Sequence, residues 1–298
     1  YTIDVPIYIG ILLLLNLDFC KFQIQFQKIS IARRKMKKVP YILCQLGIII
    51  LLGGSSVYAV QNAPIISFWN TNKSYSNSGY LSSLASETRY LTAEKPKEYS
   101  IPKVKEISEE VSATKQSTTV VIPQNIIMIM NESLADFESI GEVKTDSEIL
   151  PFIHSLNENV KHGLLHVPTF GGGTARSEYE ALSGNSMYFL PAGSVPYQLY
   201  VGNQESGMAE TLNAQGYSTI AVHPNKASNW NRANVYSSMG FDEFISIENW
   251  GDEDREKLRN YISDEAVYNK LIKLYEQKQS GEKLFTFCVT MQNHGGYE

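Results

Sequence analysis

The chain has 298 residues, of which 26 are basic, 31 are acidic and 43% are hydrophobic, and its formal net charge is −5. This composition excludes a disordered, collagen-like or disulfide-dense protein, and the mild acidity argues against nucleic-acid binding. The three cysteines, Cys20, Cys44 and Cys288, fit neither a disulfide framework nor zinc-ligand spacing. The length allows one large domain or two ordinary ones.

Two apolar runs flank a basic block near the start of the chain. Residues Val39–Val60 carry no charge and are long enough for a transmembrane helix, which needs about 20 apolar residues. The shorter run within residues 5–19 is expected to be part of a second membrane helix, with an interfacial segment as the alternative. A cleaved signal peptide starting at Met36 is the alternative, but the residues that precede Met36 argue against it.

The basic block, residues 20–38, holds seven Lys and Arg residues and no acidic one. Short loops of this kind stay in the cytoplasm, so the chain after Val60 is expected to be extracytoplasmic. We therefore predict a membrane region over residues 1–60, with its transmembrane helix at 39–60. A polar juxtamembrane linker with some helix follows over residues 61–124, and Val104–Val111 could form a short amphipathic helix within it.

From Asn125 to Glu298, short apolar runs alternate with helical patterns. The expected buried strands are Ile126–Met130, Leu164–Val167, Ser218–Val222 and Leu284–Val289. The expected helices are Glu148–Lys161, Ala175–Ser183, Glu205–Gln215 and Asp264–Gln279. This alternation predicts an α/β fold with a mostly parallel sheet flanked by helices, in which ligands bind at the carboxyl ends of the strands.

Candidate chemistry follows two of these runs. Glu132 comes directly after the first strand and could hold a divalent cation, or could be an ordinary acid in the first turn of a helix. Thr174 follows three glycines and begins a helix, where unpaired N–H groups favour an anion. A hydroxyl placed there beside a metal can act as a nucleophile on phosphorus, whereas the alternative is a plain N-cap.

Two further loops carry groups suited to a phosphate ester. His223, Trp230 and Arg232 follow the Ser218 strand within ten residues, and Arg is suited to gripping a phosphate. His294 follows the last strand, where it could be a general acid or a donor to a phosphate oxygen. The alternatives are a surface loop anchored by its Trp, and a His that bonds loop backbone. His154, His162 and His166 lie in or beside helix and strand patterns and are interpreted as structural.

The motifs after the strands resemble, in order and spacing, those of the lipoteichoic acid synthase family, within the alkaline phosphatase and sulfatase superfamily. The resemblance covers residues 125–298 and rests on NIIMIMNES, PFIHSLNENVKHG, FGGGTARSEYEALSGNSMY, GYSTIAVHPNKASNWNRANVYSSMGFDEF, SDEAVY and FCVTMQNHGGYE. It implies a membrane-anchored enzyme that transfers glycerol phosphate from phosphatidylglycerol to a polymer acceptor of the cell envelope.

The resemblance also implies roles for particular residues. Thr174 matches the nucleophile that becomes phosphorylated, and Glu132 and Thr174 match ligands of a Mn²⁺ or Mg²⁺ ion. The matching substrate-binding residues are His223, Trp230, Arg232 and His294.

The sequence departs from the family in two respects. Its GGGTARSE motif differs from the loop of the best-known lipoteichoic acid synthases, which leaves the acceptor open. The family's remaining metal ligands are an Asp-His pair that comes later than Glu298, so residues 1–298 alone are expected to bind metal weakly and to show no turnover. Three alternatives remain. The first is a sulfatase, which needs a C/S-x-P-x-R pattern that Thr174 and its neighbours lack. The second is a phosphoethanolamine transferase, which usually carries disulfides. The third is a non-catalytic membrane-anchored binding protein.

Overall fold

The computed structural model describes residues 71–296, apart from residues 79, 92, 94, 114–121, 142, 170–171 and 203–204. Both predicted membrane helices lie outside the described residues. Within the described part, no helix combines the length and the apolar character needed to cross a membrane. The chain divides into two compact units, one formed by Tyr1–Ala93 with Pro191–Ser194, the other by Glu94–Leu190 with Val195–Glu298.

Most of the described part of the first unit is helical. Helix α3 (Thr71–Ser78), helix α4 (Tyr80–Glu87) and the short helix η1 (Thr88–Tyr90) follow one another. Tyr75 donates its hydroxyl to Glu87 Oε1 at 2.6 Å, which ties the start of α3–α4 to its end. This helical segment falls within the stretch that we predicted to be a linker.

A four-stranded parallel sheet forms the centre of the second unit. Its strands are β1 (Asn125–Met130), β2 (Tyr217–Val222), β3 (Glu243–Ile245) and β6 (Lys283–Val289), and they lie in the order β1-β6-β2-β3. The apolar run of β6 is buried along nearly its whole length because this strand has neighbours on both edges and helices on both faces. The predicted α/β fold with a parallel sheet is thereby confirmed.

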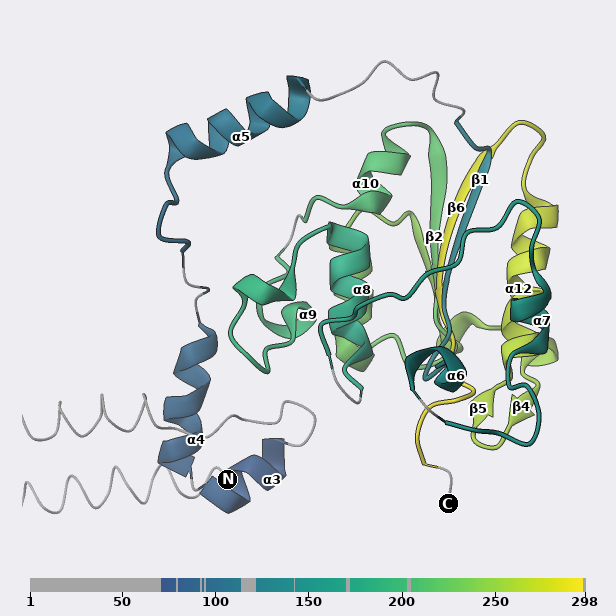
Figure 1. Ribbon diagram of the computed structural model, residues 1–298, viewed down its shortest axis with the longest axis horizontal. Coiled ribbons are helices and arrows are strands. Elements are labelled where there is room, and N and C mark those ends of the chain that lie inside the picture. The colour runs from purple at the N-terminus through teal and green to yellow at the C-terminus, as the bar shows by residue number, and fades with distance from the viewer. Residues whose placement is uncertain are drawn as a thin grey trace, which may run out of the picture. The chain divides into compact units, whose positions relative to one another are not determined.

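Helices cover both faces of this sheet (Figure 1). Helices α8 (Thr174–Ser183), α10 (Met208–Asn213) and α11 (Arg232–Ser238) lie on one side, and α12 (Asp264–Gln277) with α7 (Pro151–Ser155) lies on the other. The remaining elements are α5 (Ile101–Ala113), α6 (Phe137–Ile140), η2 (Met187–Phe189), α9 (Pro196–Leu199), η3 (Asn229–Asn231), η4 (Ile247–Asn249), η5 (Asp252–Asp254), β4 (Lys257–Leu258) and β5 (Tyr261–Ile262).

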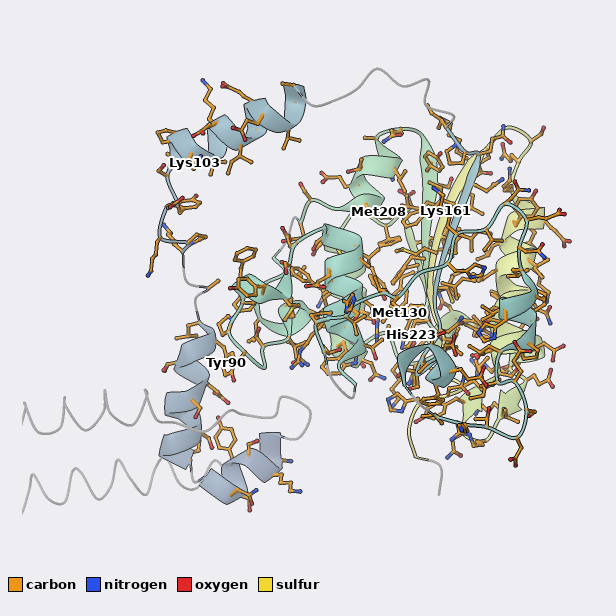
Figure 2. All side chains as sticks on the ribbon, in the orientation of Figure 1. Tyr90, Lys103, Met130, Lys161, Met208 and His223 are labelled. Carbon is orange, nitrogen blue, oxygen red and sulfur yellow. The ribbon has the colours of Figure 1, made fainter. Side chains whose placement is uncertain are left out.

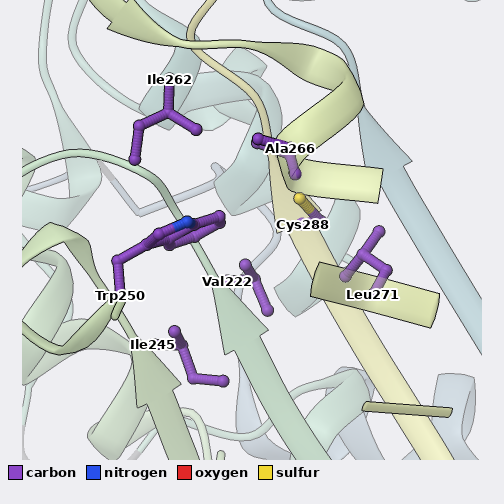
Figure 3. Close-up of a cluster of buried hydrophobic side chains, with 8 residues drawn as sticks. Val222, Ile245, Trp250, Ile262, Ala266, Leu271 and Cys288 are labelled. Atoms are coloured by element: carbon purple, nitrogen blue, oxygen red, sulfur yellow. The ribbon is translucent and has the colours of Figure 1, made fainter. Parts of the chain in front are cut away.

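Successive side chains of β6 point into different cores, as strand geometry requires. Phe287 faces Tyr236 of α11, with ring centroids 6.1 Å apart. Its neighbour Cys288 belongs to an apolar cluster on the α12 side, around Trp250 and Leu271 (Figure 3). Helix α12 begins where Ser263 caps it by accepting a hydrogen bond from the Ala266 N–H at 3.1 Å.

Three of the four predicted strands are present, but the one at Leu164–Val167 is wrong. Those residues form no strand, and Leu164 and Leu165 are 63% and 86% exposed. An apolar run becomes a strand only where a neighbouring backbone can bond it, and no strand of the described sheet pairs with this run. Helix α7 is also much shorter than the helix predicted over Glu148–Lys161.

Candidate functional site

The carboxyl ends of β1, β2 and β6 meet at one edge of the sheet, as the parallel register requires. Met130 ends β1 and His223 follows β2, and both lie toward this edge (Figure 2). The loop after β6 is joined to the loop after β1, because Thr290 Oγ1 accepts a hydrogen bond from the Glu132 N–H at 3.0 Å. This buried bond fixes the position of Glu132 at the strand ends.

The carboxylate of Glu132 meets the hydroxyl of Thr174. Thr174 Oγ1 donates to Glu132 Oε2 at 3.0 Å, and Ser133 Oγ donates to Glu132 Oε1 at 3.0 Å. Thr174 is the first residue of α8, and Gly172 and Gly173 before it have φ values of 102° and 78°. Such left-handed backbone favours glycine, so these glycines allow the sharp entry that directs Thr174 toward β1.

The Glu132–Thr174 pair has the chemistry and spacing of two metal ligands. Carboxylate and hydroxyl oxygens suit Mg²⁺ or Mn²⁺, and adjacent octahedral ligands at about 2.1 Å from the ion lie about 3.0 Å apart. The observed separation of 3.0 Å fits this arrangement. The described residues contain no group of three or more His, Cys, Asp or Glu side chains able to hold a metal.

His223 is buried and neutral. Burial, with the nearby charge of Arg232 adding to it, lowers the pKa of His223 to about 3. Its Nδ1–H donates to the carbonyl oxygen of Val289 at 3.0 Å, and its Nε2 accepts from Arg232 Nη1 at 3.2 Å. The two bonds together select one tautomer, with the proton on Nδ1.

Arg232 is held by a carboxylate that sequence reasoning missed. Its Nε donates to Glu178 Oε2 at 3.2 Å and its Nη2 donates to Glu178 Oε1, so the pairing is bidentate. Tyr236 donates to the same Glu178 Oε2 at 2.7 Å. Burial alone would raise the pKa of Glu178, but the charge and hydrogen bonds of Arg232 outweigh it and hold this pKa below its usual value.

A signal for Glu178 does exist in the sequence. Ala175, Glu178, Tyr179 and Leu182 are the buried residues of α8, and they recur with the i, i+3, i+4, i+7 spacing of a core-facing helix stripe. A glutamate inside such a stripe needs a buried partner, because an unpaired buried charge is very costly. Arg232 is the partner that the fold supplies.

Trp230 lies in the connection between β2 and α11 with unusual backbone geometry. Trp230 and Asn231 have φ values of 56° and 63°, in the left-handed region that non-glycine residues rarely adopt. Asn231 is fixed there by a hydrogen bond from its Nδ2 to the Tyr197 carbonyl oxygen at 3.1 Å. Trp230 itself is half-buried.

His294 lies in the loop after β6 and contacts the β4–β5 hairpin. Its Nδ1 is 3.3 Å from the Tyr261 hydroxyl, and the two rings lie 5.5 Å apart. Arg259 of the same hairpin donates to the carbonyl oxygens of Gln292 and Gly296, on either side of His294. His294 follows β6 and His223 follows β2, so both histidines lie beyond the carboxyl ends of neighbouring parallel strands.

His154, which we interpreted as structural, bonds two carboxylates. Its Nδ1 lies 2.6 Å from Glu148 Oε1 and its Nε2 lies 3.0 Å from Asp136 Oδ2. These hydrogen bonds, that with Asp136 first, raise the pKa of His154. The cluster joins α7 to the loop before α6.

The sequence pattern of the Sulfatase family matches residues 124–298, which is more than half of the chain. The chain belongs to the sulfatase family. The match begins just before β1 and includes all the candidate site residues named above. Members of this superfamily, which includes alkaline phosphatase, are generally dependent on divalent metals.

Two of the proteins that the chain resembles are named for lipoteichoic acid synthesis and for phosphoglycerol transfer. A lipoteichoic acid synthase of Staphylococcus saprophyticus is 29% identical over 185 residues, covering 57% of this chain and 26% of its own length. The solved phosphoglycerol transferase GacH of Streptococcus pyogenes, in complex with sn-glycerol-1-phosphate, is 27% identical with a TM-score of 0.56. It covers 69% of this chain and 55% of its own length.

A third relative, of Rhizobium meliloti (strain 1021), is named for the modification of cyclic beta-1,2-glucan. It is 33% identical over 230 residues, which are 77% of this chain and 34% of the relative. The chain therefore spans about a third or less of the curated relatives described here. The resemblance to lipoteichoic acid synthases within this superfamily is confirmed.

Proposed function

We propose that this sulfatase-family chain carries the phosphoryl-transfer site of a membrane-anchored, extracytoplasmic phosphoglycerol transferase. The enzyme moves glycerol phosphate from phosphatidylglycerol to a polymer acceptor of the cell envelope. The observation that carries the proposal is the 3.0 Å hydrogen bond from Thr174 Oγ1 to Glu132 Oε2, at the start of a helix and at the carboxyl edge of a parallel sheet. The likeness to GacH, which was solved with glycerol phosphate bound, supports the choice of substrate.

In the proposed first step, Thr174 Oγ1 attacks the phosphorus of the phosphatidylglycerol phosphodiester. A bond forms between Oγ1 and phosphorus, the bond from phosphorus to the diacylglycerol oxygen breaks, and diacylglycerol leaves as an alcohol after it takes up a proton. The proton lost by Thr174 is the one directed at Glu132 Oε2. The nucleophile and its first acceptor are therefore already within hydrogen-bond distance, as covalent catalysis requires.

In the second step, a hydroxyl of the acceptor polymer attacks the same phosphorus. The new phosphoester bond forms to the acceptor, the Oγ1–phosphorus bond breaks, and Thr174 regains a proton that the acceptor hydroxyl gives up. Splitting the transfer at Thr174 allows the lipid and the polymer to use the site in turn. The N-terminus of α8, a helix of ten residues, favours the negative charge of the phosphate in both steps.

Glu132 and Thr174 are the proposed ligands of a Mn²⁺ or Mg²⁺ ion. When bound, such an ion lowers the pKa of a coordinated hydroxyl and offsets negative charge on the phosphate oxygens. The Glu132 carboxylate is preset for this role, since Ser133 and Thr174 hold its two oxygens by hydrogen bonds.

The proposed substrate-binding residues are His223, Trp230, Arg232 and His294. Arg232 supplies positive charge beside the neutral His223, and the half-buried Trp230 gives a wall for the glycerol. His294, whose Nδ1 faces Tyr261, is the candidate donor to a phosphate oxygen or to the leaving group. The proposed membrane anchor is the predicted helix at residues 39–60, which would leave the site outside the cytoplasm.

The direct test is to look for the covalent intermediate. The product of the complete gene, purified in detergent, is mixed with phosphatidylglycerol and Mn²⁺, quenched in acid and digested for peptide mass spectrometry. We expect a glycerol phosphate group on Thr174, absent from the Thr174→Ala variant.

Two comparison substrates separate the alternatives. Phosphatidylethanolamine tests for a phosphoethanolamine transferase, which would modify Thr174 with phosphoethanolamine, and a chromogenic sulfate ester tests for sulfatase activity. An enzyme that turns over phosphatidylglycerol without any modification of Thr174 contradicts the proposed mechanism. Binding without turnover of any of these substrates favours a non-catalytic role.

A further inference from the structure

Glu178 lies one helical turn after Thr174 on α8 and is completely buried, with 0% of its surface exposed. Residues four apart on a helix lie on the same face, so Thr174 and Glu178 project to the same side of α8. One helix thus carries both the proposed nucleophile and the carboxylate that binds Arg232.

A continuous series of hydrogen bonds begins at Glu178. The carboxylate binds Arg232 through Nε and Nη2, Arg232 Nη1 donates to His223 Nε2 at 3.2 Å, and His223 Nδ1 donates to the Val289 carbonyl oxygen at 3.0 Å. Tyr236 adds a bond of 2.7 Å to Glu178 Oε2. The series joins α8, α11, the end of β2 and the end of β6.

The geometry of this series restricts Arg232 strongly. A guanidinium held at two nitrogens by one carboxylate cannot turn about its own axis, because the planar fork matches the two oxygens. The remaining nitrogen, Nη1, is then directed at His223. Arg232 is only 2% exposed, so this orientation is not set by solvent.

Stability alone is a weak reason for such a pair. Replacing a buried ion pair by apolar residues of similar volume is often neutral or stabilising, since removing two charges from water is costly. Here the pair connects the Thr174 helix to His223 of the proposed substrate site, so a fixed orientation of the pair can position the His223 imidazole.

We infer that Glu178 is a positioning residue that holds the Arg232 guanidinium, and through it the His223 imidazole, at a fixed place relative to Thr174. This inference rests on the proposed function for its consequence in catalysis, but the fixed geometry of His223 can be measured without any turnover. Glu178 touches no substrate in this arrangement and acts through Arg232.

The test compares Glu178→Asp with Glu180→Gln in the product of the complete gene. Aspartate keeps the charge but draws the carboxylate back by one methylene, whereas Glu180 is on the same helix and binds the Met187 N–H outside the site. We expect Glu178→Asp to lower kcat/KM for phosphatidylglycerol roughly 100-fold, as for a catalytic group displaced by about 1 Å. Glu180→Gln should stay within about twofold of the wild type.

A double-mutant cycle shows whether Glu178 acts through Arg232. In an Arg232→Lys background, we expect Glu178→Asp to cause no more than about a twofold further loss. Equal losses in both backgrounds would overturn the inference. If Glu178→Asp fails to fold, the double variant Glu178→Met with Arg232→Met is used, because it removes both charges. The activity of this double variant should equal that of Arg232→Met alone. A lower activity of the double variant would count against the inference.

Nitrogen-15 NMR of histidine-labelled protein gives a readout that does not depend on activity. In the wild type we expect His223 as the single tautomer protonated at Nδ1, and in Glu178→Asp a mixture of tautomers or a shifted Nε2 resonance. An unchanged His223 spectrum with unchanged kcat/KM would overturn the inference. If the wild type forms no adduct on Thr174, the proposed function fails, while the His223 spectra still decide the role of Glu178.

Discussion

The hydroxyl of Thr174 donates to the carboxylate of Glu132 at 3.0 Å, although 42 residues separate them in the chain. The bond joins the first residue of α8 to the loop after β1, and neither residue is held there by its own element alone. Glycines at φ 102° and 78° bring Thr174 to the sheet edge, and Thr290 fixes the backbone of Glu132. The proposed chemistry depends on this meeting point.

Replacing Thr174 should therefore abolish transfer. We expect Thr174→Ala to lower the transfer rate by at least about a thousandfold, because the covalent intermediate can no longer form. Thr174→Ser, which keeps a hydroxyl, should retain measurable activity. The measurement is release of diacylglycerol from phosphatidylglycerol by the product of the complete gene.

The matched control for this substitution is Thr211→Ala. Thr211 is also a helix threonine, but its hydroxyl bonds the Gly207 carbonyl oxygen on α10, away from the site. It should keep wild-type activity. If Thr174→Ala and Thr211→Ala release diacylglycerol at equal rates, Thr174 is not the nucleophile.

Substitution of Glu132 should weaken metal binding. Glu132→Gln removes the negative charge that favours a hard divalent cation. We therefore expect the Mn²⁺ affinity of the complete gene product to fall by about 10-fold to 100-fold. Isothermal titration with Mn²⁺ measures this directly. Glu158→Gln, an exposed carboxylate outside the site, is the control and should leave the affinity unchanged. Equal Mn²⁺ affinities in Glu132→Gln and the wild type would remove Glu132 from the proposed ligand set.

The main elements of the fold could be predicted because their residues carry a clear burial pattern. The apolar runs of β1, β2 and β6 and the stripes of α8 and α12 each match one period, so their positions follow from the sequence. Strand β3 escaped prediction, because Glu243–Ile245 has only three residues, begins with a charged side chain and pairs only with β2. The prediction of a strand at Leu164–Val167 failed although the run is apolar, because apolar composition alone does not provide a pairing partner.

The candidate site was predicted only as far as local motifs reach. Glu132 follows a recognisable strand and Thr174 follows a run of glycines, so their roles could be predicted before their contact was known. Glu178 could be recognised only through its place among buried residues of α8, and its partner Arg232 is 54 residues away. Pairings over such distances depend on the tertiary fold, which no local pattern specifies.

The buried His223 should make the protein sensitive to acid. Its pKa is about 3 in the folded protein against an ordinary value of 6.5, so below pH 6.5 the unfolded chain binds a proton that the folded chain does not. The contribution of the neutral His223 to the free energy of unfolding is complete above about pH 6.5. It is lost as the pH falls toward 3, at up to about 1.4 kcal/mol per pH unit. The pKa of Glu178 is also lowered, so this carboxylate further reduces the free energy of unfolding as the pH falls below its usual pKa of 4.5.

Urea unfolding between pH 5 and pH 7 tests this expectation. The free energy of unfolding of the wild type should fall with decreasing pH, and His223→Gln should reduce that slope by about 1 kcal/mol per pH unit. His162→Gln is the control, because His162 is an exposed loop histidine bonded to the Leu156 carbonyl oxygen. Parallel slopes for His223→Gln and the wild type would show that His223 is not responsible.

Gly207 should be intolerant of a side chain. A Cβ at this position would lie 2.7 Å from the Leu182 carbonyl oxygen at the end of α8, a backbone atom that cannot move aside cheaply. We expect Gly207→Ala to lower the free energy of unfolding by about 1–3 kcal/mol, as for overpacking. Gly163→Ala, whose Cβ would have nothing within 4 Å, should change it by less than about 0.5 kcal/mol. Chemical unfolding of both variants gives the comparison, and equal stabilities would contradict the close approach.

Arg259 offers a way to separate activity from stability at the His294 loop. Its side chain donates to the Gln292 and Gly296 carbonyl oxygens on either side of His294, while its own φ of 58° is strained for a non-glycine residue. Arg259→Gly removes the clamp and relieves that strain. We expect stability to stay the same or rise, while kcat/KM for phosphatidylglycerol falls roughly tenfold because His294 loses its fixed position.

Lys257→Ala on the same hairpin is the control for this effect, since Lys257 is exposed and should leave kcat/KM unchanged. Tyr261→Phe gives an independent measure, because it removes only the hydroxyl that lies 3.3 Å from His294 Nδ1. If Arg259→Gly keeps wild-type kcat/KM while Tyr261→Phe lowers it, the hairpin acts on the imidazole through Tyr261 alone. If neither variant loses activity, His294 does not need its hairpin contacts for the reaction.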